Sequence, residues 1–466
     1  MSGPMALGPD AGRQDTLSLR LQGSRGVPRG GDERTLVLRM PGAGAAGAID
    51  RLAAEMADSI GPAVHPYEVA ALLESQGLTA EVIRERYGQP DLFTLATALY
   101  ERIPRTFPEP GVPADPWRPD HIRCVLRGVL FALPGLAYVL IGRIWDPDGG
   151  AYALVLAGLI SWAWGQALSH RAYLRMAIGR REAGRTLLVG APLGAAVAVA
   201  AGAALAGQGS TALFVAGQSL YLAAAGVLLV LGHESLLLLA LLPMVAGVAV
   251  LPWWEPGAPL RIGLPLLSLA GATAVAGWAL RGALAEKPAA GDSRTKLLRS
   301  LPYGLFGLAA GVLVMLEGQR HPYAVVMLSL SMGPAEWLLY RYRGMSAAAL
   351  RATSTLPAFR WRSAGIITLC LLAYLLPILP VTLLIGAEPG PVLLLAATLW
   401  TALLLQAFGV AWPPAAVCLV AACGAGSLTL LHPSAAPIAL LLSCGPAAVV
   451  LAVCALSALG RPAAHA

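Results

Sequence analysis

Charge is scarce in this sequence. Asp, Glu, Lys and Arg together make up 13% of the 466 residues, about half the share found in ordinary soluble domains. Hydrophobic residues make up 57%, and the mean hydropathy is +0.66. A soluble fold of this length has too little interior to bury so much apolar surface. The composition therefore excludes a wholly soluble protein and indicates that a lipid bilayer surrounds most of the chain.

Motifs for metals, cofactors and catalysis are also missing. No cysteine forms a Cys-x-x-Cys pair or joins a histidine cluster, and all lie in apolar stretches, where cysteine usually acts as a small buried side chain. No glycine-rich phosphate loop, zinc-ligand spacing or serine-nucleophile motif is present. We therefore expect no metal, no cofactor, no nucleic-acid partner and no enzymatic activity. The six cysteines are Cys124, Cys370, Cys418, Cys423, Cys444 and Cys454.

Long apolar runs begin at Ile122 and alternate with short polar connections. A bilayer core of ~30 Å is crossed by about 20 helical residues, and each run is long enough. The sequence therefore predicts an all-α polytopic membrane protein with about 12 transmembrane helices. The spans cover about 122–142, 150–168, 186–206, 210–231, 234–253, 260–281, 299–317, 322–340, 364–386, 390–410, 412–431 and 436–459.

Basic residues in the connections predict the orientation. They concentrate after spans 2, 6 and 8, while the alternate connections hold only Arg143, Arg261 and Arg320. Because positive charge is retained on the cytoplasmic side, this bias predicts that both termini lie in the cytoplasm. The predicted location is the inner (plasma) membrane of the cell. The basic connections contain Arg171, Arg175, Arg180, Arg181, Arg185, Arg281, Lys287, Arg294, Lys296, Arg299, Arg341, Arg343, Arg351, Arg360 and Arg362.

The same connections suggest an internal repeat. Spans 2 and 8 both end in a Gly-x-Ala step, Gly165-Gln166-Ala167 and Gly333-Pro334-Ala335, followed by a basic connection. This layout predicts two six-helix halves in parallel orientation, an arrangement common in transporters. The first half covers 122–285 and the second 299–460, with a cytoplasmic connection at 286–298.

The first 121 residues are polar and divide into three parts. Residues 1–49 are predicted to be a flexible or partly β arm, because 16–21 and 34–39 alternate polar and apolar residues. Residues 50–104 are predicted to form a small cytoplasmic helical domain, and 105–121 a stiff proline-rich linker. Proline or capping residues mark three of its helices, namely Pro66, Thr79 and Asp91. The predicted core of this domain is Val69, Leu72, Leu73, Val82, Leu92, Leu95, Ala96 and Leu99.

Polar side chains inside the predicted spans are candidates for a substrate cavity, because such groups are costly in a bilayer. Other roles remain open for each of them. Arginines near the inner end of span 1 could extend to the interface, glutamines could bond between helices, and Glu336 could pair with Arg341. The five candidates are Arg127, Gln166, Gln218, Glu336 and Gln406.

The first outer connection contains Asp146-Pro147-Asp148. Paired acids at this place resemble the metal or sugar site of membrane glycosyltransferases. The run Asp-Pro-Asp-Gly-Gly is also a favourable turn sequence, and every outer connection is short. We expect a turn.

Prolines inside many spans, Pro134 among them, are expected to kink helices around a central path.

The stretch from Ala172 to Arg185 carries a family resemblance. Its Gly179, Glu182, Ala183 and Arg185 match the loop after the second helix of the multidrug/oligosaccharidyl-lipid/polysaccharide flippase superfamily. The twelve-span layout also resembles that superfamily, and in particular its Pel-type polysaccharide exporters. The resemblance implies transport, although span 1 lacks the buried acid of cation-coupled drug exporters. The superfamily has no standard head like residues 1–115, which resembles the heads of uncharacterised actinobacterial membrane proteins.

We therefore expect a transporter, a flippase or exporter of lipid-linked or polymeric carbohydrate that works by alternating access. The alternative is a non-transporting membrane scaffold or regulatory protein whose head, residues 50–104, recruits a cytoplasmic partner. An enzyme acting on lipid-linked substrates would depend on Asp146 and Asp148. A polar cavity between the two halves would favour transport, and a solid apolar interface would favour the scaffold.

Overall fold

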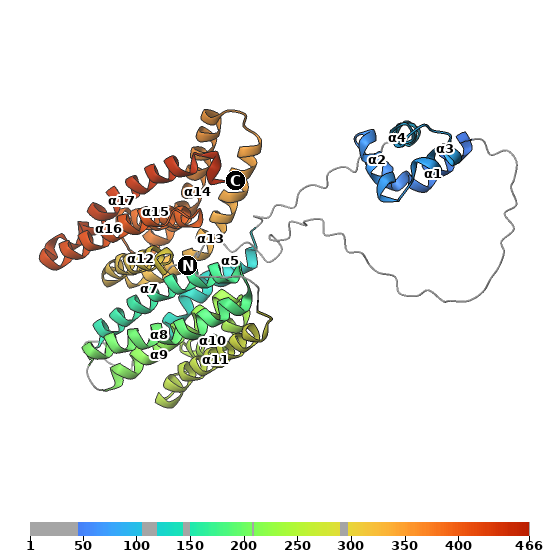
Figure 1. Cartoon of the computed structure of the whole chain (residues 1–466). Helices are drawn as coiled ribbons and strands as arrows, with labels where there is room; N and C mark the ends of the chain where they lie inside the picture. Colours follow the sequence, from blue (N-terminus) through green and yellow to red (C-terminus); the bar gives the residue numbers. More distant parts are fainter. Residues whose placement is uncertain (1–44, 105–118, 143–149, 207–208, 289–296, 466) are drawn as a thin grey trace, which may run out of the picture. The chain divides into compact units, whose positions relative to one another are not determined.

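The computed structural model describes residues 45–104, 119–142, 150–206, 209–288 and 297–465. The chain divides into two compact units, one within residues 15–115 and one that includes residues 116–466. The described residues are helical and contain no strand (Figure 1). The alternating stretches at 16–21 and 34–39 and the Asp-Pro-Asp turn lie outside the described residues.

The smaller unit is a four-helix domain. Its helices are α1 (Ala45–Ile60), α2 (Pro66–Ser75), α3 (Ala80–Tyr87) and α4 (Leu92–Arg102). Three of them begin at the signals that the sequence contains, Pro66, Thr79 and Asp91. Their facing sides enclose one apolar core, which includes Leu73, Leu95 and Leu99.

Side-chain hydrogen bonds cap the helices of this domain. The Thr79 hydroxyl accepts from the backbone N–H of Val82, and Gly88 ends the same helix in the left-handed conformation, with φ of 64°. Asp91 and Thr94 form a reciprocal capping box at the start of α4. These contacts satisfy backbone groups that a helix end leaves open.

One predicted core position of the domain is wrong. Val82 is 40% exposed, while its neighbour Ile83 is only 1% exposed and fills the core. The two residues differ by about 100° around a helix, so a one-residue error in the phase of a short helix exchanges the buried and the exposed side chain.

The described residues of the larger unit form twelve helical spans, as predicted. The first is interrupted at Pro134 by a 3₁₀ turn, η1 (Leu133–Gly135), because proline cannot donate the helical hydrogen bond. The spans are α5 (His121–Ala132) with α6 (Leu136–Ile141), α7 (Ala151–Met176), α8 (Arg180–Ala206), α9 (Ser210–Leu231), α10 (Glu234–Val250), α11 (Ala258–Ala285), α12 (Leu301–Arg320), α13 (Pro322–Arg351), α14 (Leu356–Leu384), α15 (Pro389–Ala407), α16 (Trp412–Leu431) and α17 (Ala436–Leu459), with short 3₁₀ turns η3 (Leu297–Arg299), η4 (Pro433–Ala435) and η5 (Pro462–Ala464).

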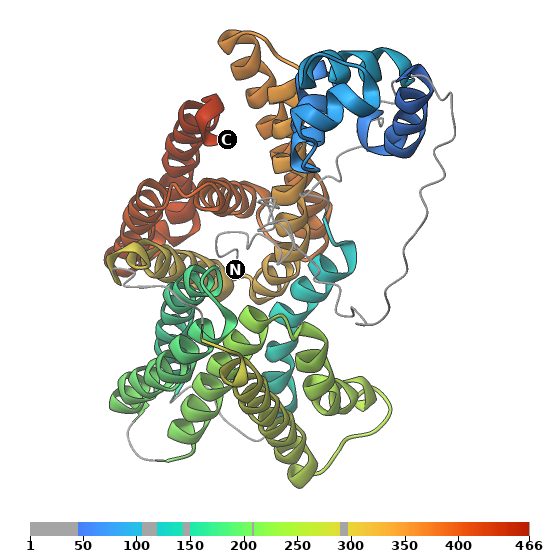
Figure 2. The ribbon, with the colours of Figure 1, turned by 45° about the vertical axis from the view of Figure 1, so that its right-hand side comes forward.

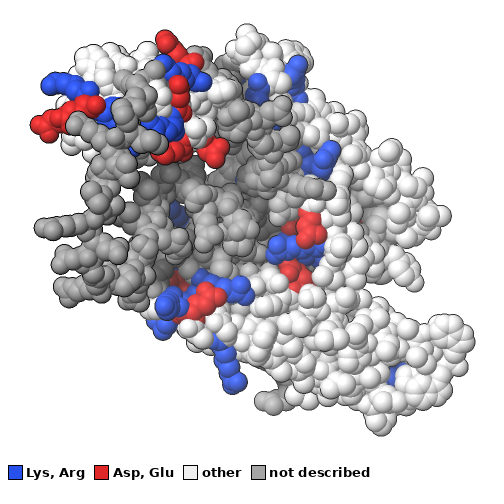
Figure 3. All heavy atoms as spheres, turned by 90° about the vertical axis from the view of Figure 1, so that its right-hand side faces the viewer, with Lys and Arg blue, Asp and Glu red and all other residues white. Residues whose placement is uncertain are grey.

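Ten of these spans are long and apolar enough to cross a membrane by length and composition. The other two differ for different reasons. Helix α10 has 17 residues, and α13 carries Glu336, Arg341, Arg343 and Arg351 over its 30 residues. The chain is thus a multi-pass membrane protein. On the face that Figure 3 shows, charged side chains of the described residues gather in a few clusters, and uncharged residues make up most of the rest of the described surface.

Two of the three basic connections, those after spans 2 and 8, are mostly helical, which the sequence did not predict. Helix α7 runs to Met176 and α8 starts at Arg180, so the connection after the second span has only three residues outside the helices. Helix α13 likewise continues to Arg351, and α14 starts at Leu356. The apolar signal ends where a helix leaves the hydrocarbon, whereas the helix continues into water.

The six spans of each half share a core of their own. One buried cluster is built from α12 to α17, and another from α5, α6 and α7 to α11. Equivalent neighbours recur in the two groups: α10 packs on α11 and α16 on α17, and α9 packs on α11 and α15 on α17. The two halves meet where α5 crosses α13 and α7 crosses α12 (Figure 2). Each contact joins the first span of one half to the second span of the other, which is the pattern of two equivalent repeats.

Candidate functional site

A central cavity lies between the two halves. It has a volume of ≈ 560 Å³ and is lined by α5, α6, α7 and α9 from the first half and by α12 to α15 from the second. The lining reaches Ala151, the first residue of α7, and Tyr138 near the end of α6. Both residues lie toward the predicted outer side. The cavity therefore extends toward that end of the bundle.

Most of the cavity wall is apolar. The described lining residues include no Asp, Glu, Lys, Arg or His, and rings such as Phe131, Trp162 and Phe306 face the space. The polar lining groups can donate and accept hydrogen bonds but carry no charge. They are Tyr138, Gln166, Gln218, Ser329 and Tyr374.

Two predicted candidates, Gln166 and Gln218, line this cavity. Gln166 lies over a glycine of the facing half, since a Cβ atom at Gly307 would come within 2.6 Å of its Cγ atom. Gln218 accepts a hydrogen bond from the Tyr138 hydroxyl at 2.8 Å and donates to the Leu154 carbonyl at 3.4 Å. The first glutamine thus lies at the contact between the halves, and the second on the first-half wall.

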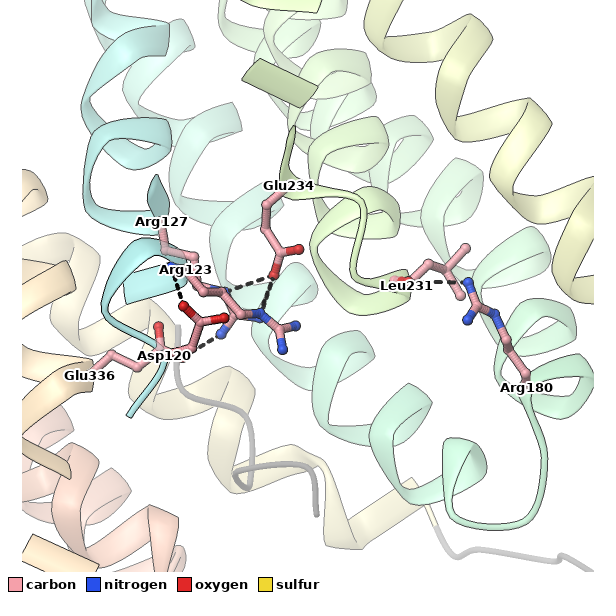
Figure 4. Close-up of polar contacts among 7 residues, drawn as sticks. All are labelled: Asp120, Arg123, Arg127, Arg180, Leu231, Glu234 and Glu336. Carbon is pink, nitrogen blue, oxygen red and sulfur yellow. Dashed lines mark hydrogen bonds and ion pairs between the residues drawn. The ribbon is translucent and has the colours of Figure 1, made fainter. Parts of the chain in front are cut away.

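The two ionisable candidates, Arg127 and Glu336, do not line the cavity. They form an ion pair that joins the first half to the second (Figure 4). Arg127 also donates to Glu234 of α10, with Nη2 to Oε1 at 2.9 Å, and Arg123 donates to the same oxygen at 2.8 Å. We call Arg123, Arg127, Glu234 and Glu336 the charge cluster. Along α5 it precedes the cavity residue Phe131, so it lies nearer the predicted cytoplasmic end.

Backbones approach closely beside the charge cluster. A Cβ atom added to Gly128 of α5 would lie 2.7 Å from the Leu330 carbonyl oxygen of α13, and one added to Gly333 would lie 2.6 Å from the Cys124 carbonyl oxygen. Only glycine fits at both positions, so the helices cross with almost no side chain between them. The predicted cytoplasmic end of the cavity is therefore closed by backbone contact and by ion pairs.

Glu234 is a member of the charge cluster that the sequence analysis did not predict, because an acidic residue at the start of a helix is common. It is the first residue of α10, where a carboxylate suits the helix dipole, and its side chain is only 7% exposed. The preceding His233 contacts Arg180, with Nε2 to Nη2 at 3.4 Å. Burial, followed by the nearby Arg180 charge, lowers the pKa of His233, so its neutral ring can accept from the arginine.

The fifth candidate, Gln406, lies inside the second half rather than at the cavity. It is 1% exposed, and its Nε2 atom has no hydrogen-bond partner within the described part of the chain. The sequence reasoning also missed Glu317 of α12, which is fully buried. Its Oε1 lies 2.9 Å from His321 Nδ1, and its Oε2 has no partner among the described residues. Glu317 could have been predicted as a candidate because it is an acidic residue inside an apolar run.

Comparison with known proteins finds similarity only among solved structures. No protein-family model matches the chain, and no curated protein matches its sequence. The chain is similar to a multidrug resistance MATE family transporter of the MOP superfamily in its outward-facing conformation, with 14% identity, 74% of this chain and 97% of that chain covered, and a TM-score of 0.44.

Two further structures have similar values. One is a MOP superfamily transporter from Pyrococcus furiosus, described by the reverse polarity of its binding pocket, with 13% identity, 74% and 98% coverage and a TM-score of 0.42. The other is MATE in complex with Br-NRF, with 14% identity, 73% and 97% coverage and a TM-score of 0.40.

Proposed function

We propose that this chain is a membrane transporter that moves lipid-linked carbohydrate across the membrane by alternating access. The observation that carries the proposal is the central cavity between two equivalent halves, which extends toward one end of the bundle and is closed at the other. A scaffold has no need of such a space. Alternation would require α5 and α13 to separate at the charge cluster while the opposite end closes.

The cavity wall favours a lipid-linked substrate over a free polysaccharide. A sugar chain without a lipid offers little apolar surface, whereas the described wall is mainly Leu, Phe, Trp, Met, Val and Ala. Sites that bind small molecules pair such walls with a few hydrogen-bonding groups that orient the ligand. Gln166 and Gln218 are the amides that could orient sugar hydroxyls here.

The test is flipping of head-group-labelled lipids by the purified full chain in proteoliposomes. We expect protein-dependent flipping of a labelled glycolipid, and we expect Gln166→Leu to slow it about tenfold, the effect of losing one buried hydrogen bond of ~1.4 kcal/mol. Gln406→Leu is the matched control, because this glutamine is buried away from the cavity. Absence of flipping for every cell-envelope lipid class tested would overturn the proposal.

A second candidate function is recruitment of a cytoplasmic partner by the four-helix domain. Its surface carries an exposed ring cluster, His65, Tyr67 and Phe93, in which the Tyr67 and Phe93 rings meet edge to face at 5.7 Å. Tyr67 is 67% and Phe93 is 58% exposed. Exposed neighbouring aromatic rings are characteristic of protein-binding surfaces.

The domain has its own core and caps, so residues 45–104 can be used as bait. We expect Tyr67→Ser and Phe93→Ser to abolish capture of a specific partner, while Val82→Ser, at another exposed apolar position, leaves it intact. Equal capture by all three variants would contradict this function.

A further inference from the structure

A second cavity lies within the first half, separate from the contact between the halves. It has a volume of ≈ 250 Å³ and is enclosed by η1, α6, α9, α10 and α11. Three of its lining residues, Leu213, Ile262 and Leu266, are 76%, 39% and 56% exposed. In a membrane, these exposed side chains of α9 and α11 face lipid. The second cavity therefore lies directly beneath the lipid-facing surface.

The two cavities share a wall. Tyr138, Gln218 and Leu222 line both of them. The hydrogen bond from the Tyr138 hydroxyl to Gln218 Oε1 joins α6 to α9 along that wall. The Gln218 amide also lies against Gly158 of α7, where a Cβ atom would come within 2.6 Å of Nε2. The hydrogen-bonded Tyr138 and Gln218 side chains therefore belong to the wall between the two cavities.

The two cavities differ in the bonds that they offer. The second cavity has no Asp, Glu, Lys, Arg or His among its described lining residues, and the Ser268 hydroxyl in it already accepts from the backbone N–H of Met244. Apart from the shared wall, Ser268 and Tyr221, the described side chains that line it are hydrocarbon. The central cavity adds the uncharged polar groups Gln166, Ser329 and Tyr374. One cavity therefore suits a hydrocarbon chain, and the other suits an uncharged polar group.

We propose that the second cavity binds a hydrocarbon chain of the substrate while its uncharged, hydroxyl-rich head group lies in the central cavity. The ligand class is a neutral glycolipid that enters between α9 and α11. This inference rests on the proposed transport function and narrows its substrate. A phosphate-bearing head group would need a cation, and Arg127, about one helical turn before the cavity residue Phe131 on α5, is already bound by two glutamates.

The test is photo-cross-linking of the full chain in nanodiscs with a glycosyl diacylglycerol that carries a diazirine in one acyl chain. Cross-links should concentrate on the second-cavity side chains of α9 and α11, between Leu213 and Leu222 and between Ile262 and Leu269. A second probe with the same sugar on an isoprenyl chain distinguishes the two sources of hydrocarbon. An acidic phospholipid with the same diazirine chain should label these segments at least about tenfold less, a factor that corresponds to ~1.4 kcal/mol.

Variants on one helix supply the control. Leu266→Trp places an indole in the second cavity and should lower its labelling about tenfold, whereas Leu267→Trp, exposed but outside the cavity lining, should leave it unchanged. Equal labelling of both variants, or equal labelling by the acidic lipid, would overturn the inference. Labelling reads binding and flipping reads transport. Retained labelling without flipping would therefore refute the proposed transport while the lipid site stands.

Discussion

Two glycines, Gly128 and Gly333, show how single residues determine the closure of the cavity. At each position, a Cβ atom would lie within 2.7 Å of a carbonyl oxygen of the opposite helix. The Gly-Pro-Ala step that contains Gly333 could be recognised in the sequence, but its meaning could not. A glycine in a membrane helix has many explanations, and only the fold shows which backbone approaches it.

We expect Gly333→Ala to force α5 and α13 apart and to expose Cys124, which is only 3% exposed. The clash involves backbone atoms, which cannot rotate away, so a cost of about 1–3 kcal/mol is expected. The measurement is the maleimide labelling rate of a chain that keeps Cys124 and lacks the other five cysteines. Gly365→Ala in α14, with open space around it, should label as slowly as the parent chain, and equally slow labelling of Gly333→Ala would count against the contact.

Among the helices, those of the four-helix domain were the most predictable. Pro66, Thr79, Gly88 and Asp91 mark their ends by local chemistry, so no knowledge of the tertiary structure is needed. The membrane helices were predictable in their apolar middles and less so at their ends. Their extensions into water, such as the last turns of α7, depend on neighbouring helices and not on hydrophobicity.

The capping box makes the domain sensitive to acid. The backbone hydrogen bond from Thr94 lowers the pKa of Asp91. A lowered folded-state pKa contributes stability that is complete above the unfolded pKa of about 3.9 and is lost as the pH falls through the folded value. We expect the melting temperature of the isolated domain to drop below about pH 4 more steeply than that of Asp91→Asn, which caps a helix without titrating.

Thermal melts of both proteins by circular dichroism across this pH range provide the measurement. The two should agree closely at neutral pH, because asparagine caps about as well as aspartate. Parallel melting curves down to pH 3 would show that Asp91 does not contribute in this way.

On the scale of the whole molecule, the charge cluster separates two kinds of interaction. Glu234 holds both arginines to the first half, whereas Glu336 alone joins Arg127 to the second half. The sequence provided Arg127 and Glu336 as polar residues in spans but suggested Arg341 as the partner of Glu336. Their pairing spans 209 positions, and a contact between halves is set by how the repeats dock, which local patterns do not encode.

We expect Glu234→Gln to reduce thermal stability more than Glu336→Gln, because it removes the carboxylate that Arg123 and Arg127 share. Arg127 is buried, and the loss of a buried ion-pair partner destabilises a fold by about 3–5 kcal/mol. Glu336→Gln should instead have the larger effect on Cys124 labelling, since the Arg127–Glu336 bond is the one that joins the two halves within the charge cluster. Melting temperature and labelling rate of the two variants are the measurements. If the same variant had the larger effect on both the melting temperature and the labelling rate, the cluster would have a single structural role.

The composition of the charge cluster has a consequence for the energetics of transport. Two arginines and two glutamates carry no net charge together. Each unit charge that crosses the membrane potential contributes about 2.3 kcal/mol per 100 mV, so a gate with unbalanced charge would be driven or held by the voltage. Opening this contact separates Glu336 on the second half, which carries one negative charge, from Arg123, Arg127 and Glu234 on the first half, which carry one net positive charge. Any part of this separation that runs along the membrane normal should make the rate of the gating step depend on the membrane voltage.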